Sequence, residues 1–165
     1  GLNRAGAFVV SHTSHKNPAY AERVASVSGK KPIAWTSHHW TKLQVHAIEG
    51  KRSEELDWLM GKNVAVRLGI GYPGPVVEAL VRLGAKISLQ LPAGDHQPFS
   101  DSEIEMLIQA SKEVDAVVMT LKDWVKARDV IDLTQLQCPI VVPNLVLEMV
   151  DGDKELESLL LSVFK

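Results

Sequence analysis

Residues 63–91 read NVAVRLGIGYPGPVVEALVRLGAKISLQL, and they have the clearest folding pattern of the chain. Residues 63–68 are a short valine-rich run that is typical of a buried strand. Residues 75–83 have the apolar spacing of an amphipathic helix, which Gly84 ends, and residues 86–91 again have the pattern of a strand. A strand, a crossover helix and a second strand form a parallel pair, so this stretch predicts an α/β fold with a mostly parallel sheet.

The sequence after this stretch continues the alternation of strands and helices. Ser100 and Glu103 have the spacing of a capping box, in which the hydroxyl and the carboxylate satisfy free amides at a helix start. Residues 115–119 predict a strand, and Thr120 is a suitable N-cap for a short helix over residues 121–127. Two further strands and a last helix are expected over residues 139–142, 145–150 and 153–164. The apolar side chains expected to pack that helix onto the core are Leu156, Leu159, Leu160 and Val163.

The sequence before residue 62 predicts the end of one α/β unit and a connector. A strand over residues 7–11 precedes a helix over residues 19–27, which begins at the N-cap Asn17 and a first-turn proline. Residues 40–48 alternate between apolar and polar side chains in the manner of a half-exposed antiparallel strand. We therefore expect the end of a first α/β unit, a two-stranded linker and a carboxyl-terminal α/β/α domain over residues 1–38, 39–61 and 62–165.

Composition restricts the possible classes of protein and of site. The 165 residues are 45% apolar and 23% charged with a formal net charge of -2, which fits a globular protein and gives no electrostatic reason to bind nucleic acid. Cys138 is the only cysteine, so neither an intrachain disulfide nor a thiolate zinc site is expected. No apolar run reaches the roughly 20 residues that span a bilayer, and the first residues lack a signal-peptide pattern. We therefore expect a cytoplasmic or peripheral protein.

An acidic residue and a histidine follow the strand expected over residues 86–91. Asp95 and His96 lie in the loop between that strand and a helix that begins near Asp101. Ligands of open α/β sheets bind outside the carboxyl ends of strands, and a histidine there can move protons near neutral pH. The two residues are therefore candidate site residues. The alternative is that Asp95 caps a turn and His96 is an ordinary surface histidine.

Residues 69–74, GIGYPG, match the G-x-G-x-x-G pattern of dinucleotide-binding folds. Like that pattern, they follow an expected strand and precede an expected helix. That pattern aims backbone amides at a pyrophosphate, whereas Pro73 and Pro75 have no amide hydrogen. A tight structural turn is the favoured interpretation, and a dinucleotide-binding oxidoreductase domain is an alternative. A P-loop motif is absent from the sequence, since neither Gly29-Lys30 nor Gly61-Lys62 has the required upstream glycine or following serine or threonine.

Lysine side chains follow the strand expected over residues 115–119. Lys122 and Lys126 are four residues apart on one helix face and could hold an anion, with Asp123 placed to favour the helix dipole. The alternative is an ordinary helix cap with solvated lysines. His38 and His39 have no third ligand at a suitable spacing, so no metal site is predicted.

Several of these motifs occur together in a known order. They are residues 2–5 (LNRA), 69–73 (GIGYP), 84–85 (GA), 95–100 (DHQPFS), 115–126 (DAVVMTLKDWVK) and 151–153 (DGD). In order and spacing they resemble the tetraacyldisaccharide 4'-kinase family, the lipid A kinases of Gram-negative bacteria. The resemblance covers essentially the whole chain, but only the carboxyl-terminal half of such an enzyme, because family members also have an amino-terminal P-loop domain.

The resemblance implies two Rossmann-like α/β/α sandwich units joined by a small two-stranded linker. It also implies ATP-dependent phosphorylation of the 4'-hydroxyl of a tetraacyldisaccharide 1-phosphate, a lipid A precursor, at the cytoplasmic face of the inner membrane. ATP and Mg²⁺ would be bound mainly by the amino-terminal P-loop domain. This chain alone would therefore be inactive.

The same resemblance assigns roles to individual residues. His96 is the catalytic histidine, which acts with an aspartate of the amino-terminal half to position and deprotonate the sugar hydroxyl. Asp95 orients its loop, and Arg4 and Lys122 bind substrate. The chain departs from the family pattern at Gln97, at Leu121 and at residues 74–76. A non-catalytic partner-binding module is a further alternative, which a native reading frame without a P-loop would favour.

Overall fold

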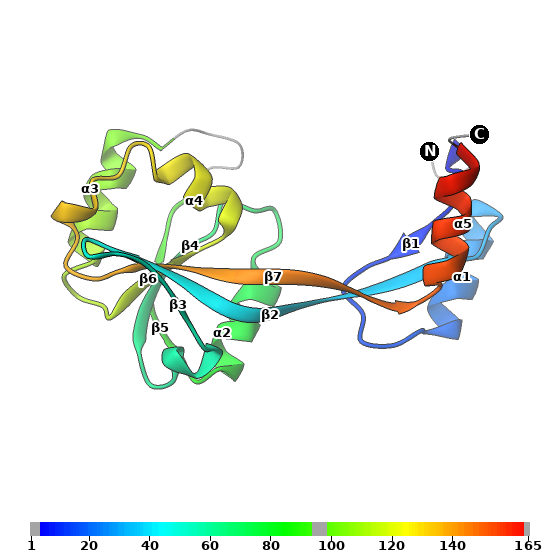
Figure 1. Cartoon of the computed structure of the whole chain (residues 1–165), viewed down its shortest axis with the longest axis horizontal. Helices are drawn as coiled ribbons and strands as arrows, with labels where there is room; N and C mark the ends of the chain where they lie inside the picture. The colour runs from blue at the N-terminus through cyan, green and yellow to red at the C-terminus, as the bar shows by residue number, and fades with distance from the viewer. Residues whose placement is uncertain (1–3, 94–98, 164–165) are drawn as a thin grey trace. The chain divides into compact units, whose positions relative to one another are not determined.

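The computed structural model describes residues 4–93 and 99–163, and the chain divides into two compact units (Figure 1). The first unit combines Gly1–His39 with Leu145–Lys165, and the second unit is Trp40–Asn144. The first boundary lies beside the one expected after residue 38. Residues 145–165, however, group with the amino-terminal segment, and residues 40–61 group with the larger unit. The first unit is therefore built from both ends of the chain.

The strands of the described residues form one mixed sheet of seven strands. Its order is β1 (Val9–Val10), β2 (Ala34–Ala47), β7 (Ile140–Asp151), β6 (Ala116–Met119), β4 (Asn63–Arg67) and β5 (Lys86–Leu91), and β3 (Gly50–Glu54) pairs with β2. The pairs β1–β2, β7–β6, β6–β4 and β4–β5 are parallel, and the pair β2–β3 is antiparallel. The mostly parallel α/β fold predicted from the sequence is confirmed.

The α-helices of the second unit begin where the sequence predicts. In α2 (Gly74–Arg82) the N-cap is Pro73. The capping box of α3 (Asp101–Ala110) is confirmed, because the Ser100 hydroxyl accepts from the Glu103 amide and the Glu103 carboxylate accepts from the Ser100 amide at 2.9 Å. The hydroxyl of Thr120 caps α4 (Leu121–Ala127). Two short 3-10 turns complete the unit, η2 (Leu56–Leu59) and η3 (Leu133–Gln135).

Helices cover both faces of the sheet in the second unit. Neighbouring residues of β4 point to opposite faces, so Val64 packs in one apolar cluster and Ala65 in the other. Leu80 of α2 belongs to the first cluster, and Leu107 of α3 and Trp124 of α4 belong to the second. In Figure 1, α2 accordingly lies on one side of the strands, and α3 and α4 lie on the other. The unit is a three-layer α/β/α sandwich.

The first unit contains β1, α1 (Pro18–Ser28) and α5 (Asp153–Val163), together with the first residues of β2 and the last residues of β7. The Asn17 side chain caps α1 by accepting from the Tyr20 amide at 3.0 Å, as predicted. Gly152 precedes α5 with a φ of +81°, and a Cβ there would lie 1.9 Å from the carbonyl oxygen of Ile33. Only glycine fits at position 152, because any side chain there would overlap the backbone at the start of β2.

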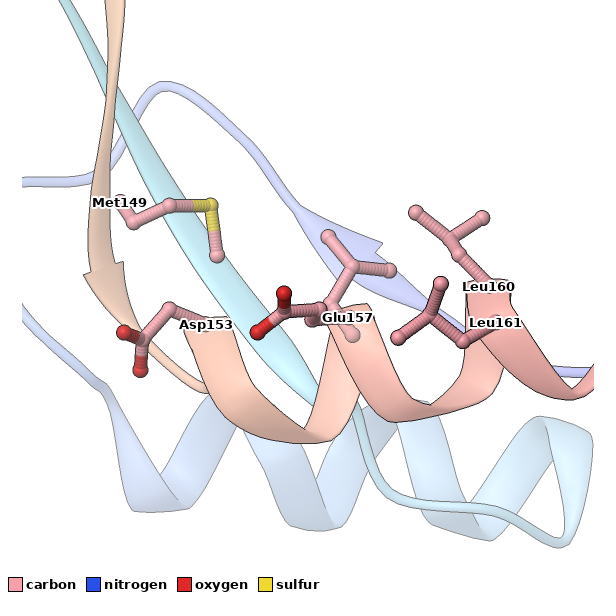
Figure 2. A pocket seen from close by; sticks show the side chains of 6 residues that line it. Met149, Asp153, Glu157, Leu160 and Leu161 are labelled. Atoms are coloured by element: carbon pink, nitrogen blue, oxygen red, sulfur yellow. The ribbon is translucent and has the colours of Figure 1, made fainter.

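The expected burial of the last helix is wrong for two of its residues. Leu159 is 37% exposed and Leu160 is 53% exposed, because the described part of the first unit does not cover this face of α5. The side chain of Val163 lies outside the described residues. A pocket beside this helix is lined by Met149 of β7 and by Asp153, Leu156, Glu157, Leu160 and Leu161, and Figure 2 shows these side chains.

Three strands differ in length from the prediction. The strand expected over residues 40–48 is β2, which begins already at Ala34 and ends at Ala47. The strands expected over residues 139–142 and 145–150 are one strand, β7, which continues through Pro143. The strand expected over residues 7–11 is limited to Val9–Val10. Within the described ranges, no helix combines the length and the apolar character needed to cross a bilayer.

Candidate functional site

The carboxyl ends of β4 and β6 lie side by side at one edge of the sheet in the second unit (Figure 1). Arg67 is the last residue of β4 and is in register with Met119, the last residue of β6. The glycine-rich turn follows the first strand, and Thr120 begins α4 directly after the second. Because open α/β sheets bind ligands at this edge, it is the candidate functional site.

A buried arginine joins three segments at this edge. The Arg67 side chain is 3% exposed, and its Nη1 donates to Oδ1 of Asp123 at 3.1 Å. Its Nη2 donates to Oε1 of Glu103 at 2.9 Å. The guanidinium carbon also lies 3.5 Å from the centre of the Phe99 ring. One planar cation therefore contacts the residue that precedes the α3 cap, the first turn of α3 and the first turn of α4.

Asp123 is the second centre of this network, and its side chain is 2% exposed. Its Oδ2 accepts from the amide of Gly69 at 3.0 Å and from the hydroxyl of Thr120 at 2.7 Å. The Thr120 hydroxyl accepts in turn from the Asp123 amide at 3.2 Å. The carboxylate thus ties the turn after β4 to the start of α4, where the helix dipole also favours a negative charge.

Glu103 belongs both to the capping box of α3 and to the ion pair with Arg67. Desolvation by burial acts to raise the pKa of Glu103. The hydrogen bonds from the Ser100 amide, the Arg67 guanidinium and the Ser100 hydroxyl outweigh that effect. The pKa of Glu103 is therefore lower than its ordinary value of 4.5, and the carboxylate is ionised at neutral pH.

The Arg67 guanidinium is engaged from several directions and is not an exposed phosphate ligand. Two of its nitrogens donate to carboxylates, one face meets the Phe99 ring, and its Nε is buried without a partner among the described residues. Lys122 lies at the same edge on the exposed side of α4, and its Nζ donates to the carbonyl oxygen of Gly69 at 3.4 Å. The network can hold this edge rigid, and the lysine offers a positive charge beside it.

The residues predicted from the sequence fall in different parts of the chain. Asp95 and His96 lie outside the described residues. Arg4 is exposed and belongs to the first unit, whereas Lys122 belongs to the second unit. Phe99, the first described residue after His96 in the sequence, contacts Arg67.

The glycine-rich segment forms a turn that is tied to α4. The amide of Gly69 donates to Asp123, so this amide is already used within the chain. Pro73 occupies the N-cap position of α2, and Tyr72, which is 76% exposed, lies against Gly74. These contacts favour the structural-turn interpretation over a pyrophosphate cradle.

Arg67 and Phe99 are the site residues that sequence reasoning missed. An arginine at the end of a valine-rich strand is a buried-charge signal, since an isolated charge inside a sheet needs a partner. Its partners Glu103 and Asp123 are 36 and 56 residues away in the sequence, so no local pattern identifies them.

The histidines near β2 form a pair in the first unit. The rings of His12 and His38 have centroids 3.9 Å apart. Burial lowers the pKa of His38, and the neighbouring charge of His12 lowers it further. In the described part of the chain, no group of three or more His, Cys, Asp or Glu side chains could hold a metal ion.

Comparisons with known proteins extend over the whole chain. A family profile described as Tetraacyldisaccharide-1-P 4'-kinase matches residues 1–165. The Tetraacyldisaccharide 4'-kinase of Chlorobaculum tepidum is 29% identical over 169 residues, which cover 100% of this chain and 47% of the relative. The protein of the same name from Bradyrhizobium sp. is 38% identical over 128 residues, which cover 77% of this chain and 34% of the relative.

A solved structure is also similar. The crystal structure of "apo" form LpxK from Aquifex aeolicus in complex with ATP aligns with a TM-score of 0.47 and 17% identity, covering 84% of this chain and 38% of that one. The chain spans about half the length, or less, of the curated relatives it matches. Because the family profile matches it from end to end, the chain belongs to the tetraacyldisaccharide 4'-kinase family.

Proposed function

We propose that this chain is the carboxyl-terminal part of a kinase that transfers the γ-phosphate of ATP to the 4'-hydroxyl of a tetraacyldisaccharide 1-phosphate. The observation that carries the proposal is the family match over residues 1–165. The buried network adds to it, because it joins three separate family-like motifs. The Arg67 guanidinium contacts Phe99 and Asp123, and the Asp123 carboxylate accepts from the Gly69 amide.

His96 is the proposed base for the attacking hydroxyl, together with an aspartate from an amino-terminal P-loop domain. Phosphoryl transfer requires mainly positioning and charge stabilisation, and a histidine with a pKa near neutrality suits the removal of the hydroxyl proton. Asp95 would orient the neighbouring loop. Lys122 and Arg4 would contact anionic groups of the substrate, and Lys122 stands at the edge where such a ligand is expected.

ATP and Mg²⁺ are assigned mainly to the amino-terminal P-loop domain in this proposal. When bound, Mg²⁺ would neutralise the charge that develops on the transferred phosphoryl group. The acceptor is a lipid A precursor with four acyl chains, so the whole enzyme would work as a peripheral protein at the cytoplasmic face of the inner membrane.

The test compares the protein from the longest native reading frame with residues 1–165 alone. Each is mixed with ATP labelled in the γ-phosphate, Mg²⁺ and the tetraacyldisaccharide 1-phosphate, and lipid-borne label is measured. The longer protein should label the lipid, and residues 1–165 should not. A longer protein without transfer would contradict the kinase proposal and favour a non-catalytic module, and turnover by residues 1–165 would contradict the need for a second domain.

Two variants of the longer protein test the role of the histidine. His96→Ala should lower kcat by roughly 10²–10⁴ and leave the KM for ATP nearly unchanged, since the nucleotide is assigned to the other domain. Gln97→Ala is the matched control and should have a much smaller effect. A His96→Ala protein with near-normal kcat and a lowered Tm would show that the histidine is a turn residue.

A further inference from the structure

The buried guanidinium of Arg67 contacts two residues that are close in sequence to His96 and Lys122, which the proposed function uses. It stacks on Phe99, which follows His96 by three residues, a contour length of about 10 Å at full extension. It pairs with Asp123, which directly follows Lys122. The two contact residues of Arg67, Phe99 and Asp123, are therefore only three residues and one residue from His96 and Lys122 in the sequence.

We propose that Arg67 is a positioning residue for the phosphoryl transfer, and this role rests on the proposed function. By pairing with Asp123 and Glu103 and stacking on Phe99, its guanidinium fixes the starts of α3 and α4 to the end of β4. Arg67 does not contact the substrate in this role. It acts through the segments that carry His96 and Lys122.

The arrangement uses properties that arginine alone supplies. The guanidinium is planar, so its two terminal nitrogens reach carboxylates on two different helices while its face meets an aromatic ring. A lysine ammonium at the same place would keep the charge but could not maintain this flat three-way contact. The three contacts of the guanidinium therefore fix the orientation of α3 relative to α4, in addition to balancing the two carboxylate charges.

The energetics of burial also favour a positioning role. Buried ion clusters stabilise a fold weakly compared with apolar side chains of equal volume, because both charges lose their hydration. The side chains of Arg67 and Asp123 are 3% and 2% exposed, and Nε of Arg67 has no partner within the described ranges. If the cluster served stability alone, apolar side chains of similar volume could replace it. Such side chains could not fix the orientation of the first turns of α3 and α4.

The experiment uses the longer native protein of the preceding test and two variants at this anchor. Arg67→Lys keeps the charge and loses the fork, and Phe99→Leu keeps an apolar side chain and loses the ring. Arg128→Lys is the matched control, because the Arg128 side chain is 55% exposed and its Nε lies 3.6 Å from Oδ1 of Asp129, which is also exposed. For each protein kcat, the KM for ATP, the KM for the lipid acceptor and the Tm are measured.

Both anchor variants should lower kcat by about 10- to 100-fold, the range expected when a reacting group is misplaced by about 1 Å. The KM for ATP should stay within about twofold of the parent value. Arg128→Lys should match the parent protein. Anchor variants with a lowered Tm but an unchanged kcat would overturn the positioning role.

A spectroscopic measurement separates this role from the proposed function. The Nε–H signal of Arg67 in the parent protein should be shifted upfield by the current of the Phe99 ring, and Phe99→Leu should abolish that shift. A parent protein with the shifted signal but without transfer would refute the kinase proposal and with it the role of Arg67. A parent protein with transfer but without the shift would refute the anchor alone.

Discussion

Replacing Asp123 by asparagine is expected to destabilise the chain by about 3 kcal/mol, the lower end of the range for breaking a buried ion pair. Asparagine keeps the shape and can still accept one of the bonds from Gly69 and Thr120. It removes the negative charge 3.1 Å from the Arg67 guanidinium, where the side chains are 3% and 2% exposed. Glu103 continues to pair with Arg67, which is why we take the lower figure.

The assay is urea unfolding of residues 1–165, followed by far-ultraviolet circular dichroism and repeated as a thermal melt. For a cooperative unit of about a hundred residues, a loss of about 3 kcal/mol lowers the Tm by roughly 10–20 °C. Asp129→Asn is the matched control and should have no measurable effect, since the Asp129 side chain is 76% exposed. The double variant Arg67→Met, Asp123→Asn should recover part of the loss, because no unpaired buried cation remains. A loss below about 1 kcal/mol for Asp123→Asn would refute the reasoning.

Three further outcomes are expected. Gly152→Ala should cost at least about 3 kcal/mol in urea unfolding, because its Cβ would meet the Ile33 carbonyl, whereas Gly29→Ala, with a similar φ of +75° and open space, should cost about 1–2; equal losses would contradict this. Cys138 should react with iodoacetamide at pH 8 about a hundredfold more slowly than a free cysteine, since burial raises the pKa of its thiol to about 11, and a normal rate would disprove it. Burial is the larger and the charge of Lys51 the smaller cause that lowers the pKa of His46. The neutral His46 side chain therefore contributes its full stabilisation above its ordinary pKa of 6.5, and this stabilisation is lost as the pH falls through the lowered pKa. The melting temperature of His46→Gln should therefore fall less than that of the parent between pH 7 and pH 5, and identical slopes would refute it.

Local patterns were sufficient to predict the elements around the candidate site. The order β4, α2, β5 follows from one valine-rich run, one amphipathic run and the glycine that ends the helix. The caps at Asn17, Ser100 and Thr120 were also predictable, because a cap depends on a side chain and an amide only two or three residues apart.

Contacts between distant segments could not be predicted in this way. Arg67 was placed in a strand, but nothing near it in the sequence indicates that its partners are Glu103 and Asp123. Likewise, the apolar spacing of α5 predicts an apolar helix face but does not show whether another element covers that face. The burial expected for Leu160 was therefore wrong. Two strands were expected on either side of Pro143, yet β7 continues through it. The register of β7 with β6 ends at Val141, so the missing amide of Pro143 is not needed for that pairing.

The second unit starts at Trp40 and ends at Asn144, on two strands that are neighbours in the sheet. The hydroxyl of Thr41 donates to the carbonyl oxygen of Asn144 at 3.5 Å, so the two ends of this unit are adjacent. Both apolar clusters consist of residues from this unit alone. Residues 40–144 therefore have the properties of an independent domain that could be expressed from one gene segment. They could also be circularly permuted, with a linker of a few residues between the present ends and new ends at the exposed turn beside Gly50.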